Sequence, residues 1–207
     1  MDFDFTDDQE QLRDAVRKWV DKGYGFERRR SIVKAGGFSR DAFGELAGLG
    51  LCGLYVPEAQ GGLGMGPVEG MVVMEEMGRG IVLEPLVQSL IAGAVLAAYA
   101  PANLSSHWLP EIASGKCIVV LAYQERAARY RLNVCAATAV PDGDAWRVSG
   151  TKSIVPVGDH ADAFLVPATI AGKIALFMVK REATGVSTRG YGTLDGGRAA
   201  EVVSKED

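Results

Sequence analysis

The spacing of apolar residues is helical over the first half of the chain. Thr6 is suited to cap a first helix, and Gln9, three residues later, completes a capping box. Ser39 is placed to cap another helix, and Pro67 stands where a proline suits a helix start. Over residues 86–100, apolar residues recur every three or four positions, as on one face of a helix. This half of the sequence predicts a helical bundle.

The pattern changes after Gly115, where short β-prone runs replace the helical spacing. Gly, Pro or Asp bounds each run, and residues 141–144 form a hairpin-type turn. Several short strands at this spacing are typical of a small barrel or sandwich. We therefore expect an α+β protein, with an N-terminal helical bundle over residues 1–115 and a small β-barrel or sandwich domain over residues 116–207. The expected strands cover residues 117–123, 134–140, 146–149, 153–157, 164–167, 174–179, 186–189 and 199–204.

Composition and charge exclude several kinds of partner. The 207 residues carry a net charge of −4 and are 48% hydrophobic, an ordinary balance for a globular protein. Such a chain has no electrostatic footprint for nucleic acid. The longest apolar stretch is too short and too mixed to cross a membrane, and the acidic N-terminus does not resemble a signal peptide. We expect no nucleic-acid or membrane partner and a cytoplasmic protein.

The isolated reactive residues indicate no catalytic or metal centre. Cys52, Cys117 and Cys135 stand far apart in apolar settings, so we expect buried thiols and no metal site. His107 and His160 have no obvious carboxylate or cysteine partner, which favours structural roles. No glycine-rich stretch has the frame of a phosphate loop or of a dinucleotide-binding fingerprint. Residue chemistry alone therefore names no reaction.

One longer string is more specific. Residues 43–64 read FGELAGLGLCGLYVPEAQGGLG, a helix, a closely packed turn and a Gly-rich loop that curls where side chains would clash. This string resembles the acyl-CoA dehydrogenase pattern L-x-x-L-G-L-x-G-L-x-V-P-E-x-x-G-G-x-G. Further segments resemble the same family in the same order, and the resemblance covers nearly the whole chain. They are residues 5–13, 75–79, 108–115, 148–152, 160–162 and 193–198.

The resemblance implies a reaction and a cofactor. Enzymes of this family desaturate an acyl-CoA thioester between its α and β carbons: a glutamate removes the α-proton, and the flavin of FAD accepts the β-hydride. That base belongs to a C-terminal helical domain, which is absent from the chain and expected beyond Asp207, so we expect the chain alone to be inactive. By the same resemblance we expect an acyl-CoA substrate, an electron-transfer flavoprotein as acceptor, and a homo- or hetero-tetramer.

The flavin-facing motifs of the family are altered in this sequence. Where the family shows T-E-x-x-x-G-S-D, residues 124–131 read QERAARYR, which keeps the glutamate but adds bulk and positive charge. Where the family shows W-x-T, residues 154–156 read IVP, without the indole, the hydroxyl or the backbone N–H of the third residue. The expected cofactor contacts are Tyr123, Gln124, Glu125, Ile154 and Pro156, and the expected substrate contacts are Arg129, Tyr130 and Arg131.

These departures leave three interpretations open. In the first, FAD binds through Tyr123, Gln124 and backbone groups, with an altered, bulky substrate. In the second, the chain is a non-catalytic partner subunit that completes another chain's active site, as in heteromeric members that act on steroid side-chain thioesters. The third is an unrelated ligand-binding module. Arg126, Arg129 and Arg131 either hold phosphates of CoA or FAD or belong to a solvated loop.

Overall fold

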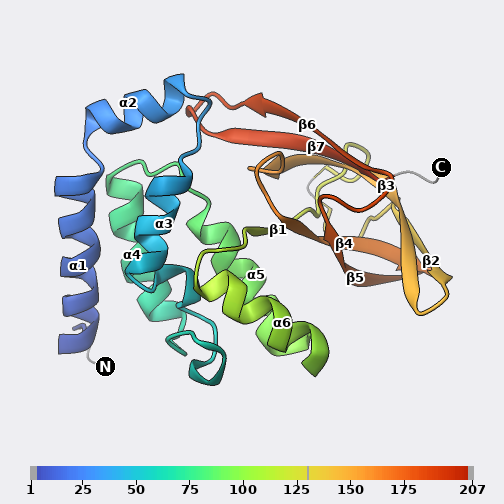
Figure 1. Cartoon of the computed structure of the whole chain (residues 1–207), viewed down its shortest axis with the longest axis horizontal. Coiled ribbons are helices and arrows are strands. Elements are labelled where there is room, and N and C mark those ends of the chain that lie inside the picture. The colour runs from blue at the N-terminus through green and yellow to red at the C-terminus, as the bar shows by residue number, and fades with distance from the viewer. Residues whose placement is uncertain (1–3, 130, 205–207) are drawn as a thin grey trace. The chain divides into compact units, whose positions relative to one another are not determined.

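The computed structural model describes residues 4–129 and 131–204, and the chain divides into two units (Figure 1). Contacts within the chain group Met1–Gly115 into one unit and Lys116–Asp207 into the other. The first unit is helical, and the second is built on a mixed β-sheet. The predicted α+β class, with helices first and β-structure second, is confirmed.

The described part of the first unit contains six α-helices and two single-turn 3₁₀ helices. Helix α1 packs along α4, and α5 packs along α6 (Figure 1). The core of this unit includes the buried side chains of Val16, Phe43, Leu46 and Leu109. The helices are α1 (Asp7–Gly23), α2 (Phe26–Lys34), α3 (Arg40–Gly48), η1 (Leu51–Gly53), η2 (Glu58–Gln60), α4 (Pro67–Arg79), α5 (Leu86–Tyr99) and α6 (Ala102–Ala113).

The predicted helix starts are confirmed where a side chain or a proline supplies the cap. The Thr6 hydroxyl accepts from the Gln9 N–H at 3.3 Å, and the Gln9 side chain accepts in return from the Thr6 N–H at 3.0 Å. Ser39 caps α3 by accepting from the Ala42 N–H at 3.2 Å, and Pro67 is the first residue of α4. Local signals of this kind therefore set the starts of three helices.

Helix α2 is not predicted by the sequence pattern. Its N-cap is Gly25, which has no side chain to accept a hydrogen bond, and only Ile32 among its nine residues is buried. A single buried position gives no helical period to read. Arg28 holds this helix from the side, because its guanidinium donates to the Gly23 carbonyl at 2.6 Å and pairs with Glu45 at 2.8 Å.

The glycine-rich loop after η1 folds back on the preceding turn. The Leu63 N–H donates to the Gly53 carbonyl at 2.9 Å, and the Gly64 N–H donates to the Val56 carbonyl at 2.9 Å. A Cβ atom at Gly62 would lie 2.0 Å from the Val56 carbonyl oxygen, well inside contact distance. The prediction that this loop curls where a side chain would clash is confirmed at Gly62.

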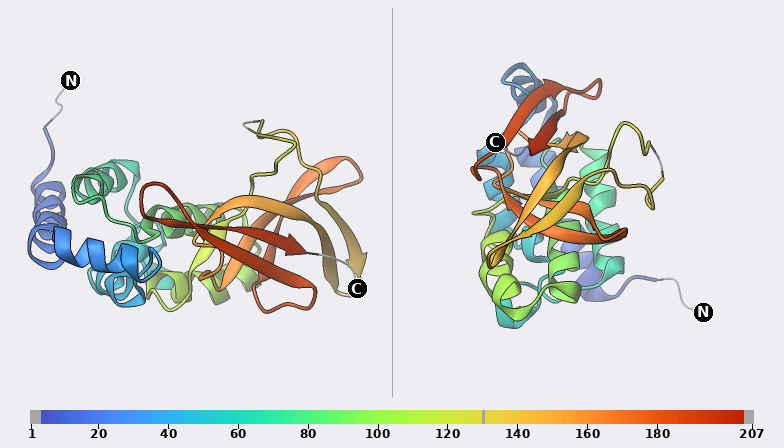
Figure 2. Two further views of the ribbon diagram at one scale, coloured as in Figure 1. Left: turned by 90° about the horizontal axis from the view of Figure 1, so that it is seen from above. Right: turned by 90° about the vertical axis from the view of Figure 1, so that its right-hand side faces the viewer.

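The second unit contains a seven-stranded mixed sheet, which curls in both views of Figure 2. The hydrogen-bonded order is β1-β4-β2-β3-β7-β6, and β5 also pairs with β4. Strands β1 and β2 run parallel to β4, whereas the other pairs are antiparallel. The strands are β1 (Val119–Leu121), β2 (Thr138–Asp142), β3 (Ala145–Pro156), β4 (Ala163–Ile170), β5 (Lys173–Lys180), β6 (Val186–Gly192) and β7 (Arg198–Ser204).

Strand β3 is one strand of twelve residues where the sequence predicted two short runs. Gly150 between those runs is no break: a Cβ atom there would lie 2.6 Å from the Cβ of Ala137, so close approach requires the glycine. The first half of β3 pairs with β2 and the second half with β7. The register against β7 shifts between Lys152 and Val155, which marks a β-bulge.

Glu84, between α4 and α5, is a buried carboxyl group that the helical unit does not neutralise. It is 5% exposed, and within the described residues neither of its carboxyl oxygens has a hydrogen-bond partner. Burial raises the pKa of Glu84, and the nearby Tyr24 hydroxyl, the backbone N–H groups of Glu84 and Ser39, and the Arg28 charge offset this only in part. The charged form of Glu84 therefore opposes folding.

The clash at Gly62 predicts a loss of stability in Gly62→Ala. The added methyl group must displace the Val56 carbonyl, so the free energy of unfolding should fall by roughly 1 to 3 kcal/mol. The control is Gly44→Ala in α3, where a Cβ atom meets nothing within 4 Å. Urea unfolding followed by far-UV circular dichroism compares the two variants, and equal midpoints would contradict the assigned clash.

The buried Glu84 predicts a pH-dependent gain of stability in Glu84→Gln. Because the folded-state pKa is raised, the wild type keeps its full stability below the unfolded-state pKa and loses part of it as the pH rises through the folded-state pKa. At pH 8 the free energy of unfolding of the variant should exceed that of the wild type by about 1 to 3 kcal/mol, and at pH 4 the two should be equal. Glu75→Gln, at an exposed position of α4, is the control. A destabilised Glu84→Gln at pH 8 would refute the argument.

Candidate functional site

A pocket of about 280 Å³ lies in the second unit, between the turn that follows β1 and the bulge in β3. We call it the Ser153 pocket. The turn belongs to the connection between β1 and β2, which stands away from the sheet in Figure 2. Six residues line the pocket, from two segments that are more than twenty residues apart in the sequence. They are Gln124, Glu125, Arg126, Arg129, Ser153 and Ile154.

Glu125, one of the lining residues, belongs to a buried ion pair. Glu125 and Lys152 are 4% and 2% exposed, and the Lys152 ammonium donates to Glu125 Oε1 at 2.6 Å. The same carboxylate accepts from the backbone N–H groups of Ala136 at 2.6 Å and Ala137 at 3.1 Å. Burial alone raises the pKa of Glu125, but Lys152 and the two N–H groups outweigh it and leave the pKa lowered. Glu125 is thus an ionised group that fixes the connection between β1 and β2 to β3.

The bulge in β3 carries the other wall of the pocket. The Ser153 N–H donates to the Gln124 carbonyl at 2.8 Å, so the bulge is tied to the segment after β1. The Ser153 hydroxyl is buried and has no hydrogen-bond partner within the described residues. Next to it, Ile154 has φ of 52° and is half exposed. A β-branched residue in this left-handed region is strained, a state that persists where the surrounding structure imposes it.

Arginines occupy the turn on the solvent side of the pocket. Residues 126–129 form that turn, and the Glu125 carbonyl accepts from the Arg129 N–H at 3.0 Å. The Arg126 guanidinium forms an ion pair with Glu201 of β7, and Glu201 also accepts from Arg189 of β6 at 2.8 Å. Arg131 instead donates to the carbonyl groups of Ala127 and Ala128 in this turn, and it does not line the pocket.

The structure brings together four of the predicted site residues, Gln124, Glu125, Ile154 and Arg129. Tyr123, Pro156 and Arg131 do not line the pocket: Tyr123 is exposed beside it, and Pro156 pairs with Ala199 in the ladder between β3 and β7. Tyr130 lies outside the described residues.

Two lining residues were not among the expected contacts. Arg126 was predicted only within a phosphate-binding group of arginines, and Ser153 was not predicted at all. Ser153 directly follows Lys152, and only the register shift against β7 brings it and its neighbour Ile154 to the same pocket. No local sequence pattern reports that shift, because it depends on pairing with a strand about fifty residues later.

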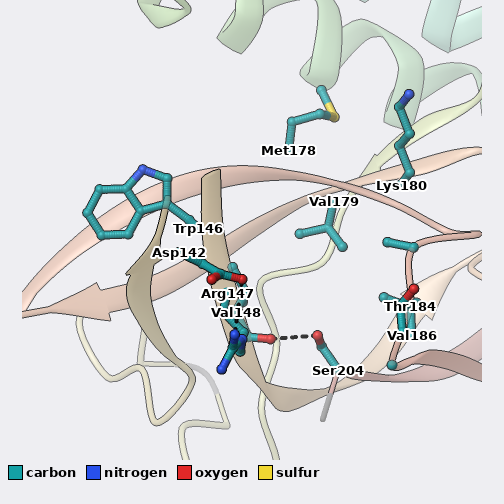
Figure 3. A pocket seen from close by; sticks show the side chains of 12 residues that line it. Asp142, Trp146, Arg147, Val148, Met178, Val179, Lys180, Thr184, Val186 and Ser204 are labelled. Carbon is teal, nitrogen blue, oxygen red and sulfur yellow. Dashed lines mark hydrogen bonds and ion pairs between the residues drawn. The ribbon is translucent and has the colours of Figure 1, made fainter. Parts of the chain in front are cut away.

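A second hollow, of about 620 Å³, opens beside the hairpin of β2 and β3 (Figure 3). Two pairs of its polar groups satisfy each other: Arg147 pairs with Asp142 at 3.1 Å, and the Ser204 hydroxyl donates to the Val148 carbonyl at 2.6 Å. Within the described residues, no buried polar atom without a partner lies in its lining. The unpartnered Ser153 hydroxyl therefore makes the smaller Ser153 pocket the better candidate for a ligand site.

The thiols and acidic groups form no metal centre in residues 4–129 and 131–204. Cys52 and Cys117 are buried, as expected, but Cys135 is only partly buried, with its sulfur 3.5 Å from Glu125 Oε1.

The helices of the described residues are all too short or too polar to cross a membrane.

Known proteins similar to this chain define its family. Residues 6–116 match the model of the acyl-CoA dehydrogenase N-terminal domain. Acyl-CoA dehydrogenase FadE12 of Mycobacterium tuberculosis is 32% identical over 190 residues, which cover 88% of this chain and 49% of that protein. The chain belongs to the acyl-CoA dehydrogenase family, and it spans about half the length of the curated relatives it matches.

Two solved structures carry the similarity through both units. A variant of the steroid ACAD Tcur3481-Tcur3483 has a TM-score of 0.89 and 31% identity, over 96% of this chain and 55% of that one. The ChsE4-ChsE5 complex from Mycobacterium tuberculosis has a TM-score of 0.89 and 27% identity, over 99% of this chain and 55% of that one. The order of helical unit and curled sheet is therefore that of the family.

The buried pair predicts a large loss of stability in Lys152→Met. Glu125 would keep its charge without its ammonium partner, so the free energy of unfolding at pH 7 should fall by roughly 3 to 5 kcal/mol. The loss should shrink at acid pH, where protonation removes the unpaired charge. Lys173→Met, at an exposed lysine of β5, is the control. Chemical unfolding at pH 7 and pH 4 measures both; an equal effect of the two substitutions would contradict the role of the pair.

Proposed function

We propose that this chain is the flavin-facing part of an FAD-dependent acyl-CoA dehydrogenase, which desaturates an acyl-CoA thioester between its α and β carbons. The observation that carries the proposal is the Ser153 pocket. It joins Gln124 and Glu125 to Ile154, and these come from the two segments that resemble the flavin-contacting motifs of the family. Membership of the family supports the reaction class.

The residues of the pocket fit a flat heteroaromatic ring with a polar edge. The Ser153 hydroxyl is a buried polar group without a partner among the described residues, and such a group calls for a ligand atom or a water. Gln124 offers a side-chain amide beside it, and Ile154 supplies an apolar wall in place of the family's indole. FAD, when bound, supplies the acceptor for the hydride.

The chain's own residues then have distinct tasks. Gln124 and Ser153 orient the polar edge of the cofactor, and Ile154 excludes water from one side of it. Glu125 is no candidate for the base that removes the α-proton, because its carboxylate is held by Lys152 and by two backbone N–H groups. We place the base in the part of the full-length relatives that this chain does not cover. The acyl-CoA substrate and an electron-transfer flavoprotein as acceptor belong to this proposal.

The proposal predicts FAD binding that depends on the Ser153 hydroxyl. Ser153→Ala should weaken FAD binding about tenfold, the effect of one lost hydrogen bond to a buried group. Ser187→Ala, at an exposed position of β6, should leave the affinity unchanged. Quenching of flavin fluorescence on titration with the chain measures both. If the wild-type chain binds no FAD, alone or with a partner subunit, the proposal is wrong.

A second candidate function is that of a non-catalytic partner subunit in a hetero-oligomer. Two observations favour it: the pocket has Ile154 where the family has a stacking indole, and two similar solved structures are the Tcur3481-Tcur3483 and ChsE4-ChsE5 pairs. In this case the chain completes a site whose flavin is held mainly by another chain. Purification with and without a co-expressed dehydrogenase subunit separates the two, because a partner subunit acquires flavin only in the mixed complex.

A further inference from the structure

We propose that Arg126 and Arg129 form a diphosphate-binding subsite at the mouth of the Ser153 pocket, in which Glu201 is a releasable counter-ion for Arg126. The subsite deepens the proposed function, since it assigns the part of the nucleotide ligand that these residues recognise. Neither arginine has a counterpart in the family pattern of this segment. Three features support the subsite: the charge of the pocket, the pairing of Glu201, and the single turn that bears both arginines.

The pocket carries an excess of positive charge. Lys152 neutralises Glu125, the one acidic residue of the lining, and Arg126 and Arg189 share the single carboxylate of Glu201. Arg129 lines the pocket as a further cation, and no acidic side chain in the described residues forms an ion pair with it. When a ligand draws Arg126 from Glu201, which Arg189 still neutralises, Arg126 and Arg129 leave two uncompensated positive charges, which suit a dianionic ligand.

Glu201 is arranged so that Arg126 can leave it at little cost. The Glu201 side chain is 16% exposed, whereas those of Arg126 and Arg189 are 76% and 77% exposed. An exposed ion pair of this kind contributes little to stability, so a ligand anion can displace it. When Arg126 turns to a ligand, Arg189 remains on the second oxygen of Glu201, and no carboxylate is left buried and unpaired.

The two arginines are positioned together by one turn. They are its first and last residues, and the Glu125 carbonyl that accepts from the Arg129 N–H also accepts from the Ala128 N–H at 3.1 Å. The turn thus rests on the residue that forms the buried pair with Lys152. Arg131 is excluded from the subsite, because its guanidinium donates to backbone carbonyl groups at 3.2 and 3.5 Å.

A diphosphate matches this arrangement better than a single carboxylate. Each guanidinium group can bind a phosphate through two parallel hydrogen bonds, and two arginines can hold two linked phosphates. FAD and coenzyme A both contain a diphosphate, so the shared chemistry has two sources. The experiment must therefore identify the group first and the source second.

The first measurement is calorimetric titration of the full chain with inorganic pyrophosphate at low ionic strength. Arg126→Ala and Arg129→Ala should each weaken binding about tenfold or more, because each removes charge-assisted hydrogen bonds. Lys173→Ala removes a positive charge from an exposed position of β5 that does not line the pocket, and it should change affinity by less than about twofold. Equal losses in all three variants, or no loss in any, would overturn the subsite.

A separate variant tests whether Glu201 competes with the ligand for Arg126. Glu201→Gln removes the competing charge from Arg126, so pyrophosphate binding should tighten by about threefold to tenfold. Unchanged or weaker binding would show that Glu201 does not compete for Arg126. Circular dichroism and thermal unfolding confirm that each variant is folded.

Titrations with FAD, riboflavin and coenzyme A then identify the source. If the diphosphate is that of FAD, Arg126→Ala and Arg129→Ala weaken the binding of FAD but not that of riboflavin, which lacks phosphate. If the diphosphate is that of the thioester substrate, the same variants weaken only the binding of coenzyme A. A chain that binds pyrophosphate or coenzyme A through these arginines but neither FAD nor riboflavin keeps the subsite and refutes flavin binding by this subunit. Wild-type affinity of both variants for all these ligands refutes the subsite.

Discussion

The buried pair of Glu125 and Lys152 is the interaction on which the candidate site depends. Two charges leave water, and this cost is offset because the carboxylate accepts three strong hydrogen bonds, from an ammonium at 2.6 Å and from two backbone N–H groups at 2.6 and 3.1 Å. Removing either partner would leave a buried charge. The pair therefore fixes, at one point, the end of the segment after β1, the start of β2 and the middle of β3.

The two walls of the pocket follow from that single fixed point. Glu125 holds Lys152 through its side chain, and the next residue of β3, Ser153, begins the bulge. The backbone carbonyl of Glu125 accepts from the N–H groups of Ala128 and Arg129 and so closes the turn that carries the arginines. The strain at Ile154, with φ of 52°, persists because β7 pairs with β3 on both sides of the bulge. One residue, Glu125, thus positions both walls of the pocket, one through its carboxylate and the other through its backbone carbonyl.

The sequence predicts most of the elements and the two segments of the candidate site, but not their local geometry. Caps such as Thr6 and Ser39 are local signals, and they set the helix starts correctly. Helix α2 has neither a capping side chain nor an apolar stripe, so nothing local announces it. Gly150 reads as a break between strands, yet it serves the close approach of Ala137 inside one long strand. The unpartnered Ser153 hydroxyl depends on register against β7, which the sequence of β3 alone does not contain.

The departures from the family pattern change what the pocket can recognise. Lys152 neutralises Glu125 of the lining, Ile154 stands where the family pattern has an indole, and two arginines line the pocket. Loss of ring stacking weakens selection for the flat part of a ligand, whereas added guanidinium groups strengthen selection for its anionic part. Recognition by charge is screened by salt, while recognition by an apolar wall is not. If the proposed function holds, the substitutions act together and move the recognition of the nucleotide ligand from its ring toward its phosphates.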